Sequence, residues 1–122
     1  MAHLIEIKTF KDGRGSLTVL DRELPFKVQR IYYIYDVPGD QVRAGHRHRK
    51  NIQALVSIRG ACNIYVNNGV TQENYLLDSA DRCLIMEPED WHTMYNFTPD
   101  AMLLVLASEP YDRDDYIDEE YP

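Results

Sequence analysis

Residues 39–60, GDQVRAGHRHRKNIQALVSIRG, contain the pattern that decides the fold of this chain. Glycines bound the stretch and its second half is an apolar run, which is typical of β-strands separated by turns. His46 and His48 are two residues apart, so on a strand their imidazoles share one face. Four cations surround them, at Arg43, Arg47, Arg49 and Lys50. The stretch therefore predicts a strand that holds two neighbouring histidines in a positively charged setting.

Strand signals extend through the rest of the chain. Short runs rich in Val, Ile, Tyr and Leu are separated by Gly, Pro, Asn and Asp, and no segment has a long helical period. Asn67-Asn68-Gly69 predicts a tight hairpin turn, because Asn and Gly tolerate positive φ. Besides the histidine strand, the expected strands are residues 4–8, 16–20, 28–37, 53–58, 62–66, 70–77, 83–86 and 101–107. So many short strands predict a closed barrel or a sandwich.

Length and composition limit the class of protein. The 122 residues are enough for one domain, and we expect residues 1–122 to form it. A net charge of −7 argues against a nucleic-acid partner, which would need a basic face. Cys62 and Cys83 are too few for a disulfide scaffold. Neither a signal peptide nor a membrane-spanning stretch is found, so we expect a cytoplasmic protein with no membrane partner. The acidic tail from about residue 110 is interpreted as partly ordered in solvent or as packing on a subunit.

Two stretches of the chain resemble the paired motifs of the cupins, which are small β-barrel proteins. The first motif, G-x5-H-x-H-x3,4-E-x6-G, is followed with one extra residue before its first histidine, at Gly39, His46, His48, Gln53 and Gly60. The second, P-x-G-x2-H-x3-N, is followed with one residue fewer before its histidine, at Pro88, Asp90, His92 and Asn96. The resemblance implies an all-β jelly-roll barrel (a double-stranded β-helix), in which strand pairing could bring His92 towards the other two histidines.

Gln53 stands where metal-binding cupins place an anionic glutamate ligand. A neutral amide is a poor replacement, because hard and borderline cations gain much of their binding from carboxylate charge. The surrounding arginines also disfavour a dication. We therefore expect no metal, while a metal-dependent, dioxygenase-like site stays an alternative, with the ligands His46, His48, Gln53 and His92.

Proton transfer accounts for the two histidines better than a metal or simple packing does. An imidazole with a pKa of about 6.5 can act as base and acid at neutral pH. Nearby cations depress that pKa and favour the neutral form that accepts a proton. A positive pocket stabilises an enolate-like intermediate, and arginine binds phosphate with two hydrogen bonds. The residues alone thus predict a barrel that binds an anionic carbonyl compound, such as a phosphorylated one, and moves a proton next to the carbonyl.

Nearly the whole chain resembles the sugar 3,4-ketoisomerases (the QdtA/FdtA, WxcM-like type), cupins that act on dTDP-4-oxo-6-deoxyglucose. The matching positions are residues 12–17, 24–26, 28, 30, 32–35, 46–48, 60, 88, 91–94, 106–108, 111–112 and 115–116. The resemblance implies a homodimer, often with exchanged N-terminal strands, and neither metal nor cofactor. It implies that the C3 proton of the 4-keto sugar is removed and a proton is returned at C4, through an enediol or enediolate. The carbonyl moves to C3, and an aminotransferase can then make a 3-amino-3,6-dideoxy sugar.

The resemblance also implies roles for single residues. His48 is expected to be the C3 base, and His46 is expected to assist at the sugar oxygens. Tyr33 or Tyr35, on the preceding strand, is expected to polarise the keto group. Four further residues are expected to bind the substrate or orient its neighbours: Arg43 and, second to it, Arg30 at the diphosphate, Gln53 at the sugar or thymine, and His92 beside the other histidines.

Two departures from the family pattern stand in residues 43–49, RAGHRHR, where the family usually reads Arg-Gly-x-His-Ala-His-Lys. Ala44 replaces a glycine, so positive φ is not freely accessible there. Arg47 replaces a small residue and should point to the opposite face of the strand, which spares the proton chemistry. It could still alter the preferred sugar or a subunit contact. A non-catalytic sugar-nucleotide binding module remains a further hypothesis, and it predicts tight dTDP binding without turnover.

Overall fold

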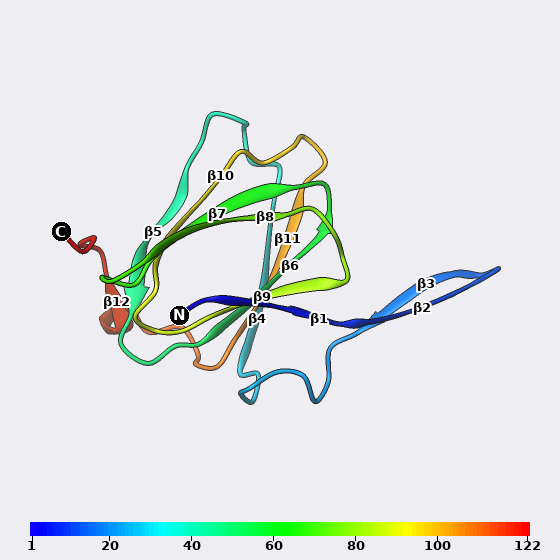
Figure 1. Ribbon diagram of the computed structural model, residues 1–122, viewed down its shortest axis with the longest axis horizontal. Coiled ribbons are helices and arrows are strands. Elements are labelled where there is room, and N and C mark those ends of the chain that lie inside the picture. Colours follow the sequence, from blue (N-terminus) through cyan, green and yellow to red (C-terminus); the bar gives the residue numbers. More distant parts are fainter.

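The computed structural model describes all residues 1–122, and strands make up nearly all of its regular structure (Figure 1). Antiparallel pairing joins ten strands into two five-stranded sheets, ordered β1-β9-β6-β11-β4 and β12-β5-β10-β7-β8. The elements are β1 (His3–Glu6), β2 (Lys8–Asp12), β3 (Gly15–Val19), β4 (Arg30–Tyr35), β5 (Arg43–His48), β6 (Gln53–Arg59), β7 (Cys62–Asn67), β8 (Gln72–Leu77), β9 (Arg82–Met86), β10 (Trp91–Tyr95), β11 (Met102–Ala107), the 3-10 helix η1 (Arg113–Asp115) and β12 (Tyr116–Ile117). The all-β fold expected from the sequence is confirmed. No helix has the length and apolar character needed to cross a membrane.

Apolar side chains cover both faces of the first sheet. A cluster of 13 buried residues, including Leu55, fills the space between the sheets. A second cluster of six, including Ala54 and Val56, lies on the outer face and is covered by the segment between β3 and β4. Successive residues of β6 therefore enter different clusters, which explains its nearly continuous apolar sequence. Cys62 and Cys83 are free and buried, one in each cluster.

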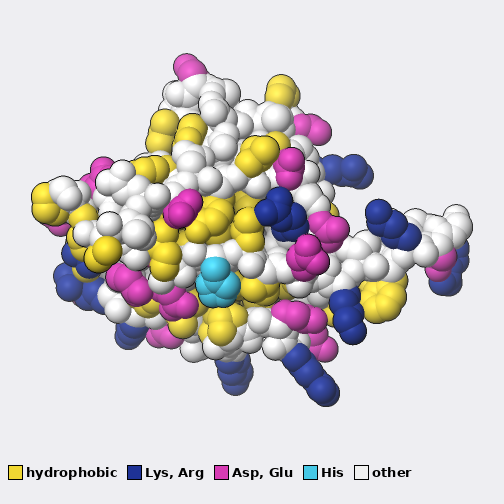
Figure 2. Space-filling model, viewed as in Figure 1, with side chains coloured by type: hydrophobic (Ala, Val, Ile, Leu, Met, Phe, Trp, Pro, Cys, Tyr) yellow, Lys and Arg dark blue, Asp and Glu magenta, His cyan; other side chains and the backbone are white.

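The hairpin formed by β2 and β3 projects away from the two sheets (Figure 1). The turn at its tip is held by Asp12, whose carboxylate accepts hydrogen bonds from the backbone and the guanidinium of Arg14. Phe10 and Leu17 are each 59% exposed on this hairpin, and Figure 2 shows its hydrophobic and charged side chains surrounded by solvent. A two-stranded ribbon without a layer behind it is marginal in water.

The structure differs from the expected elements at three places. The strand expected at residues 4–8 ends at Glu6, and residues 8–12 form a separate strand that pairs with β3. Residues 91–95 form β10, a strand that was not among those expected. The acidic tail contains a short strand that was not expected, β12, which pairs with β5 of the same chain. These differences place the tail beside the histidine strand.

Candidate active site

Three histidines meet on two neighbouring strands of the second sheet. His46 and His48 lie on β5, and His92 lies on β10 as the cross-strand partner of His46. The ring centroid of His46 lies 5.1 Å from that of His48 and 5.1 Å from that of His92. The period of two along β5 and the antiparallel register between β5 and β10 produce the cluster. The structure thus brings together the three histidines that the sequence selected.

A β-bulge next to His46 sets the position of its ring. The β10–β5 register pairs His92 with His46 and Thr93 with Ala44, so Gly45 is the extra residue. Ala44 has a φ of 68° and Gly45 a φ of 83°. Ala44 therefore takes positive φ at a position where the family has a glycine, although this conformation is not freely accessible to it. A non-glycine residue in this region is strained by about 1–2 kcal/mol, which the surrounding strand pairing has to offset.

Asp115 of η1 holds the ring of His48 from behind. The Nδ1 atom of His48 lies 2.8 Å from Oδ2 of Asp115, and both side chains are buried. A carboxylate can only accept hydrogen bonds, so Nδ1 carries the proton and donates it. The backbone N–H groups of Lys50 and Arg49 donate to Oδ1 of the same carboxylate at 2.9 and 3.2 Å. The Nε2 atom of His48 is buried with no hydrogen-bond partner. Because Nδ1 holds the proton of the neutral ring, Nε2 carries the lone pair.

Burial keeps all three imidazoles neutral. Burial lowers the pKa of His46 to about 4, and the nearby His48 ring adds a smaller shift in the same direction. Burial also lowers the pKa of His92 to about 3, and the His46 ring adds a smaller shift in the same direction. Burial also lowers the pKa of His48, although the hydrogen bond and charge of Asp115 oppose this shift. At neutral pH each ring therefore keeps a nitrogen that can accept a proton.

A cavity of about 230 Å³ opens beside His46. Its walls come from β4, β5, β10 and β12, and its lining residues are Arg30, Tyr32, Ile34, Arg43, Ala44, His46, Met94 and Tyr116. His48 lies behind this lining, with its ring centroid 4.7 Å from the ring of Tyr116. Tyr116 also lies 4.7 Å from the ring of His46. The cavity therefore presents one histidine directly and a second one beneath Tyr116.

Two arginines give the cavity a positive charge. Neither Arg30 nor Arg43 belongs to any of the five ion pairs of the structure. The guanidinium of Arg30 lies 4.5 Å from the ring centre of Tyr32 and 5.3 Å from that of Tyr111, a stacked arrangement that leaves its N–H groups free at the edges. Both arginines can therefore bind an anionic group that enters the cavity.

The tyrosines selected from the sequence lie on the wrong face of β4. Tyr33 and Tyr35 are 59% and 53% exposed and stack on each other outside the barrel, so neither reaches the cavity of this chain. Tyr32 lines the cavity instead, together with Arg30. Its hydroxyl accepts a hydrogen bond of 3.0 Å from Nε2 of Gln53, which is buried. Because Gln53 fills an acceptor site, the Tyr32 hydroxyl proton is free to point into the cavity.

Sequence reasoning missed Tyr32, Asp115 and Tyr116 as members of the site. Strand alternation gives a signal for Tyr32, since Arg30 and Tyr32 are two residues apart and share a face. Asp115 and Tyr116 belong to the matching positions of the family resemblance but follow no local pattern that places them near β5. His92, whose Nδ1 donates to the backbone carbonyl of Asp90 at 3.1 Å, has a buried Nε2 without a partner, like His48.

The metal alternative gains no support from the geometry. No group of three or more His, Cys, Asp and Glu side chains in residues 1–122 is arranged to hold a metal ion. Gln53, the fourth ligand in that alternative, donates its amide N–H to Tyr32, and its remaining carbonyl oxygen is neutral where a metal-binding cupin has a carboxylate. The donor set is better suited to proton transfer than to coordination.

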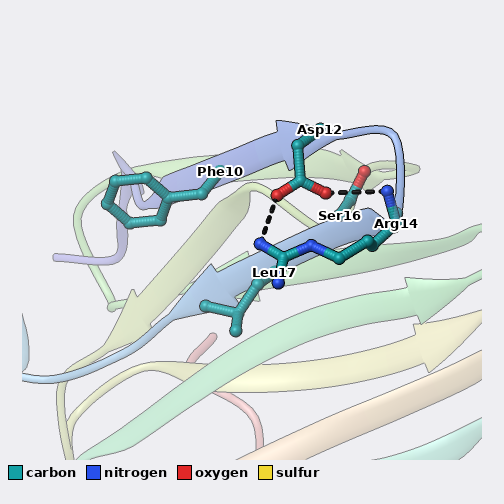
Figure 3. A pocket seen from close by; sticks show the side chains of 6 residues that line it. Phe10, Asp12, Arg14, Ser16 and Leu17 are labelled. Carbon is teal, nitrogen blue, oxygen red and sulfur yellow. Dashed lines mark hydrogen bonds and ion pairs between the residues drawn. The ribbon is translucent and has the colours of Figure 1, made fainter.

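The largest hollow of the structure lies away from the histidines, on the projecting hairpin. Figure 3 shows Phe10, Asp12, Arg14, Ser16 and Leu17 around it, with Arg14 hydrogen-bonded to Asp12. Its volume is about 530 Å³, and only residues of β2, β3 and their turn line it. It holds no histidine and has one wall, so it is better described as an open surface than as an active site.

Comparison with known proteins identifies the family of the chain. A family model described as "FdtA: WxcM-like, C-terminal" matches residues 1–121. The chain belongs to this family. The FdtA-family chain is also 38% identical over 116 residues to the TDP-4-oxo-6-deoxy-alpha-D-glucose-3,4-oxoisomerase of Aneurinibacillus thermoaerophilus, a match covering 93% of this chain and 84% of the relative.

Solved structures agree with this membership. A 3,4-ketoisomerase from Helicobacter canadensis superposes with a TM-score of 0.93 at 36% identity, covering 97% of this chain and 90% of that one. QdtA from Thermoanaerobacterium thermosaccharolyticum, solved as a histidine-to-asparagine mutant with TDP-4-keto-6-deoxyglucose, has a TM-score of 0.93 at 34% identity, covering 97% and 87%. The expected cupin-type ketoisomerase fold is thereby confirmed for this FdtA-family chain.

Proposed function

We propose that this FdtA-family protein is an isomerase that moves the keto group of a TDP-linked 4-oxo-6-deoxyhexose from C4 to C3. The observation that carries the proposal is a cluster of three neutral histidines, two of them buried, beside a cavity with two arginines that have no acidic partner. The histidines supply bases, and the arginines suit a diphosphate. The relative from Aneurinibacillus thermoaerophilus is named for this 3,4-oxoisomerisation.

Proton transfer by the two histidines of β5 balances the reaction. In our proposal His48 Nε2 takes the proton from C3, and the electrons of that bond form the C3–C4 double bond of an enediolate while C4=O becomes an oxyanion. His46 moves a proton from the C3 hydroxyl to the C4 oxygen. Protonated His48, whose Nε2 proton can exchange with solvent, then gives a proton to C4 as the carbonyl forms at C3, and this returns the imidazole to its neutral form. The net change moves one hydrogen between carbons and one between oxygens, and it needs no oxidant.

Tyr32 takes the role that the sequence analysis gave to Tyr33 or Tyr35. We propose that its hydroxyl donates a hydrogen bond to the C4 oxygen as negative charge develops there. The support is its place in the cavity wall and the hydrogen bond that it accepts from Gln53. A donor aimed at a developing oxyanion in a site closed to water contributes strongly to catalysis. Gln53 would then act through Tyr32, and His92 would orient His46.

We propose that Arg43 and Arg30 bind the diphosphate of the nucleotide. Both line the cavity, from β5 and β4, and both keep their guanidinium groups free of acidic partners. Guanidinium and phosphate oxygens form charge-assisted hydrogen bonds in pairs. The 3-keto product would then be the substrate of an aminotransferase that makes a 3-amino-3,6-dideoxy sugar. Because a charged nucleotide sugar does not cross a lipid bilayer unaided, we place this reaction in the cytoplasm.

We further propose that residues 1–122 form one domain that works as a homodimer with exchanged hairpins. The β2–β3 hairpin projects into solvent with Phe10 and Leu17 exposed, and it needs a second layer to be stable. The outer face of β4 offers such a layer, because Ile31, Tyr33 and Tyr35 are more than half exposed there. The hairpin of one subunit would pack on this face of its partner, which gives these tyrosines a role in assembly.

One experiment tests the proposed reaction. The protein is incubated with TDP-4-oxo-6-deoxyglucose in deuterated water, and proton NMR follows the sugar signals. We expect a 3-keto product with deuterium at C4. His48→Asn should abolish both turnover and exchange at C3 while leaving TDP binding intact, and His3→Asn, at an exposed position, should behave as the wild type.

Each alternative gives a different result in this experiment. Tight TDP binding without turnover by the wild type would support a non-catalytic binding module. Exchange at C3 that survives in His48→Asn but not in His46→Asn would move the base from His48 to His46. About one metal per chain in protein purified without chelator, together with loss of activity on chelation, would favour the metal-dependent alternative.

A further inference from the structure

The C-terminal strap, residues 112–122, crosses the outer face of the second sheet and reaches the histidines from behind. Its short strand β12 pairs with β5, with Tyr116 opposite His48 and Ile117 opposite Arg47. Its far end is held by hydrogen bonds from Trp91 to the Asp118 carbonyl, from Tyr65 and Asn67 to the Glu120 carboxylate, and from Tyr121 to the Glu89 carbonyl. The strap is therefore fixed to β5, β7 and the start of β10.

Arg47 helps to seat the strap. It does not line the cavity, and its guanidinium lies 4.5 Å from the ring centre of Tyr121. Gly69 supports the same ring from another side, since a Cβ at Gly69 would lie 3.0 Å from Cδ1 of Tyr121. The residue that departs from the family between the two histidines therefore contacts the strap, on the face opposite the proton chemistry.

The strap places one buried carboxylate, that of Asp115, against the proposed base. This carboxylate accepts from His48 Nδ1 and from two backbone N–H groups. Although burial by itself raises the pKa of Asp115, the hydrogen bonds from Lys50, His48 and Arg49 bring it below its ordinary value. Asp115 is thus charged at neutral pH and can only accept. Nδ1 of His48 must then hold the ring proton, and Nε2 must hold the lone pair.

We propose that Asp115 is a positioning residue that fixes His48 in the tautomer needed for proton abstraction, so that the C-terminal strap is part of the catalytic machinery. The inference rests on the proposed function for its kinetic consequence, but not for the tautomer itself. A carboxylate that orients a catalytic imidazole and stabilises its protonated form is known to affect turnover more than binding. The same arrangement here would act through His48 without touching the sugar.

The negative charge of Asp115 also raises the proton affinity of His48, and no other charged group that faces His48 has this effect. The charged and titratable groups that face His48 are Asp115 and Tyr116 of the strap, His46 of β5, His92 of β10 and Arg30 of β4. Of these only Asp115 is negative, so its removal should lower the pKa of His48. The acid limb of the pH profile of kcat/KM, which reports the essential base of the free enzyme, should move to lower pH.

The tautomer can be measured directly on the whole wild-type protein. Long-range proton–nitrogen NMR of the histidine side chains distinguishes a protonated Nδ1 from a protonated Nε2, and the His48→Asn spectrum assigns the His48 signals by their loss. We expect Nδ1 to be protonated and Nε2 to be bare at neutral pH. A protonated Nε2 in the wild type would overturn the proposal, whether or not the protein turns over the sugar.

Asp115→Asn tests the kinetic consequence. The amide can turn its NH2 group towards Nδ1, which favours the tautomer with a proton on Nε2. We expect kcat to fall about 10²- to 10⁴-fold, KM and TDP binding to change by less than threefold, and the acid limb of kcat/KM to move down by about one pH unit or more. Glu120→Gln is the matched control, because it makes the same acid-to-amide change on the strap without contacting a histidine.

The outcomes separate positioning from mere folding support. A kcat within threefold of the wild type, or an unchanged acid limb in active Asp115→Asn protein, would overturn the proposal. Equal losses in Asp115→Asn and Glu120→Gln would also overturn it, because the strap would then act only as a structural support. If Asp115→Asn does not fold, Asp115→Glu replaces it in the test. This variant keeps the negative charge, so the acid limb of its kcat/KM profile should stay at the wild-type position. A wild type without turnover contradicts the proposed function and leaves the NMR result to decide on the tautomer.

Discussion

Acidification from about pH 7.5 to about pH 5 is expected to lower the free energy of unfolding by about 2 kcal/mol through His92 alone. Burial lowers the pKa of this imidazole from 6.5 to about 3. Between those values the unfolded chain binds a proton that the folded protein does not bind, so stability falls as the pH falls from 6.5 towards 3. At pH 5 the distance from 6.5 is about 1.5 units, and each unit corresponds to about 1.4 kcal/mol.

Urea unfolding at both pH values measures this loss. His92→Asn keeps a donor for the Asp90 carbonyl but has no group that titrates. On acidification its free energy of unfolding should therefore fall by about 2 kcal/mol less than that of the wild type. His3→Asn is the matched control at an exposed position and should lose as much as the wild type. Burial raises the pKa of the Asp90 carboxyl, which acts in the opposite direction but is common to all three proteins. Equal losses in the wild type and His92→Asn would refute the reasoning.

Four further predictions concern single contacts. Ala44→Gly should raise the free energy of unfolding by about 1 kcal/mol in the same titration, because it removes left-handed strain at the bulge; no gain would mean that the bulge holds Ala44 unstrained. Tyr32→Phe should lower kcat about 10²-fold with little change in KM, as measured by NMR turnover, because an oxyanion donor is lost. Arg43→Met should raise KM by about tenfold or more through loss of a charge-assisted hydrogen bond, and an unchanged KM would place the diphosphate elsewhere. Sedimentation equilibrium should show a dimer for the wild type and a monomer when both Phe10 and Leu17 are replaced by Ser, because the hairpin then loses the apolar side chains that join two subunits.

The histidine cluster could be predicted because it depends on the simplest geometric rule of a strand. His46 and His48 share a face whatever the rest of the fold does, and one antiparallel neighbour is enough to bring His92 to them. Arg43 and Arg30 were also found in the cavity wall, since the resemblance aligned them directly. These assignments depended on spacing within one or two strands.

The tyrosine assignment failed because apolar character does not distinguish the two faces of β4, and only the alternation from Arg30 to Tyr32 does. Ile31, Tyr33 and Tyr35 look as apolar as the side chains that actually face inward, and a shift of one residue exchanges the two faces. Asp115 could not be placed for another reason. It is separated from His48 by 67 residues, and the acidic composition around it is typical of a tail in solvent. Only the pairing of β12 with β5 shows that one of those carboxylates is buried.

The order of β5, β11 and Asp115 along the chain has a consequence for biosynthesis. The strands from β1 to β11 precede the strap in the sequence, so they leave the ribosome first and can pair before the strap exists. His48 of β5 then has no carboxylate at Nδ1 until Asp115 has been made and β12 has paired with β5. A chain without Asp115 would therefore lack the carboxylate that fixes the tautomer of His48, and we expect it to be deficient in turnover even where its two sheets have formed.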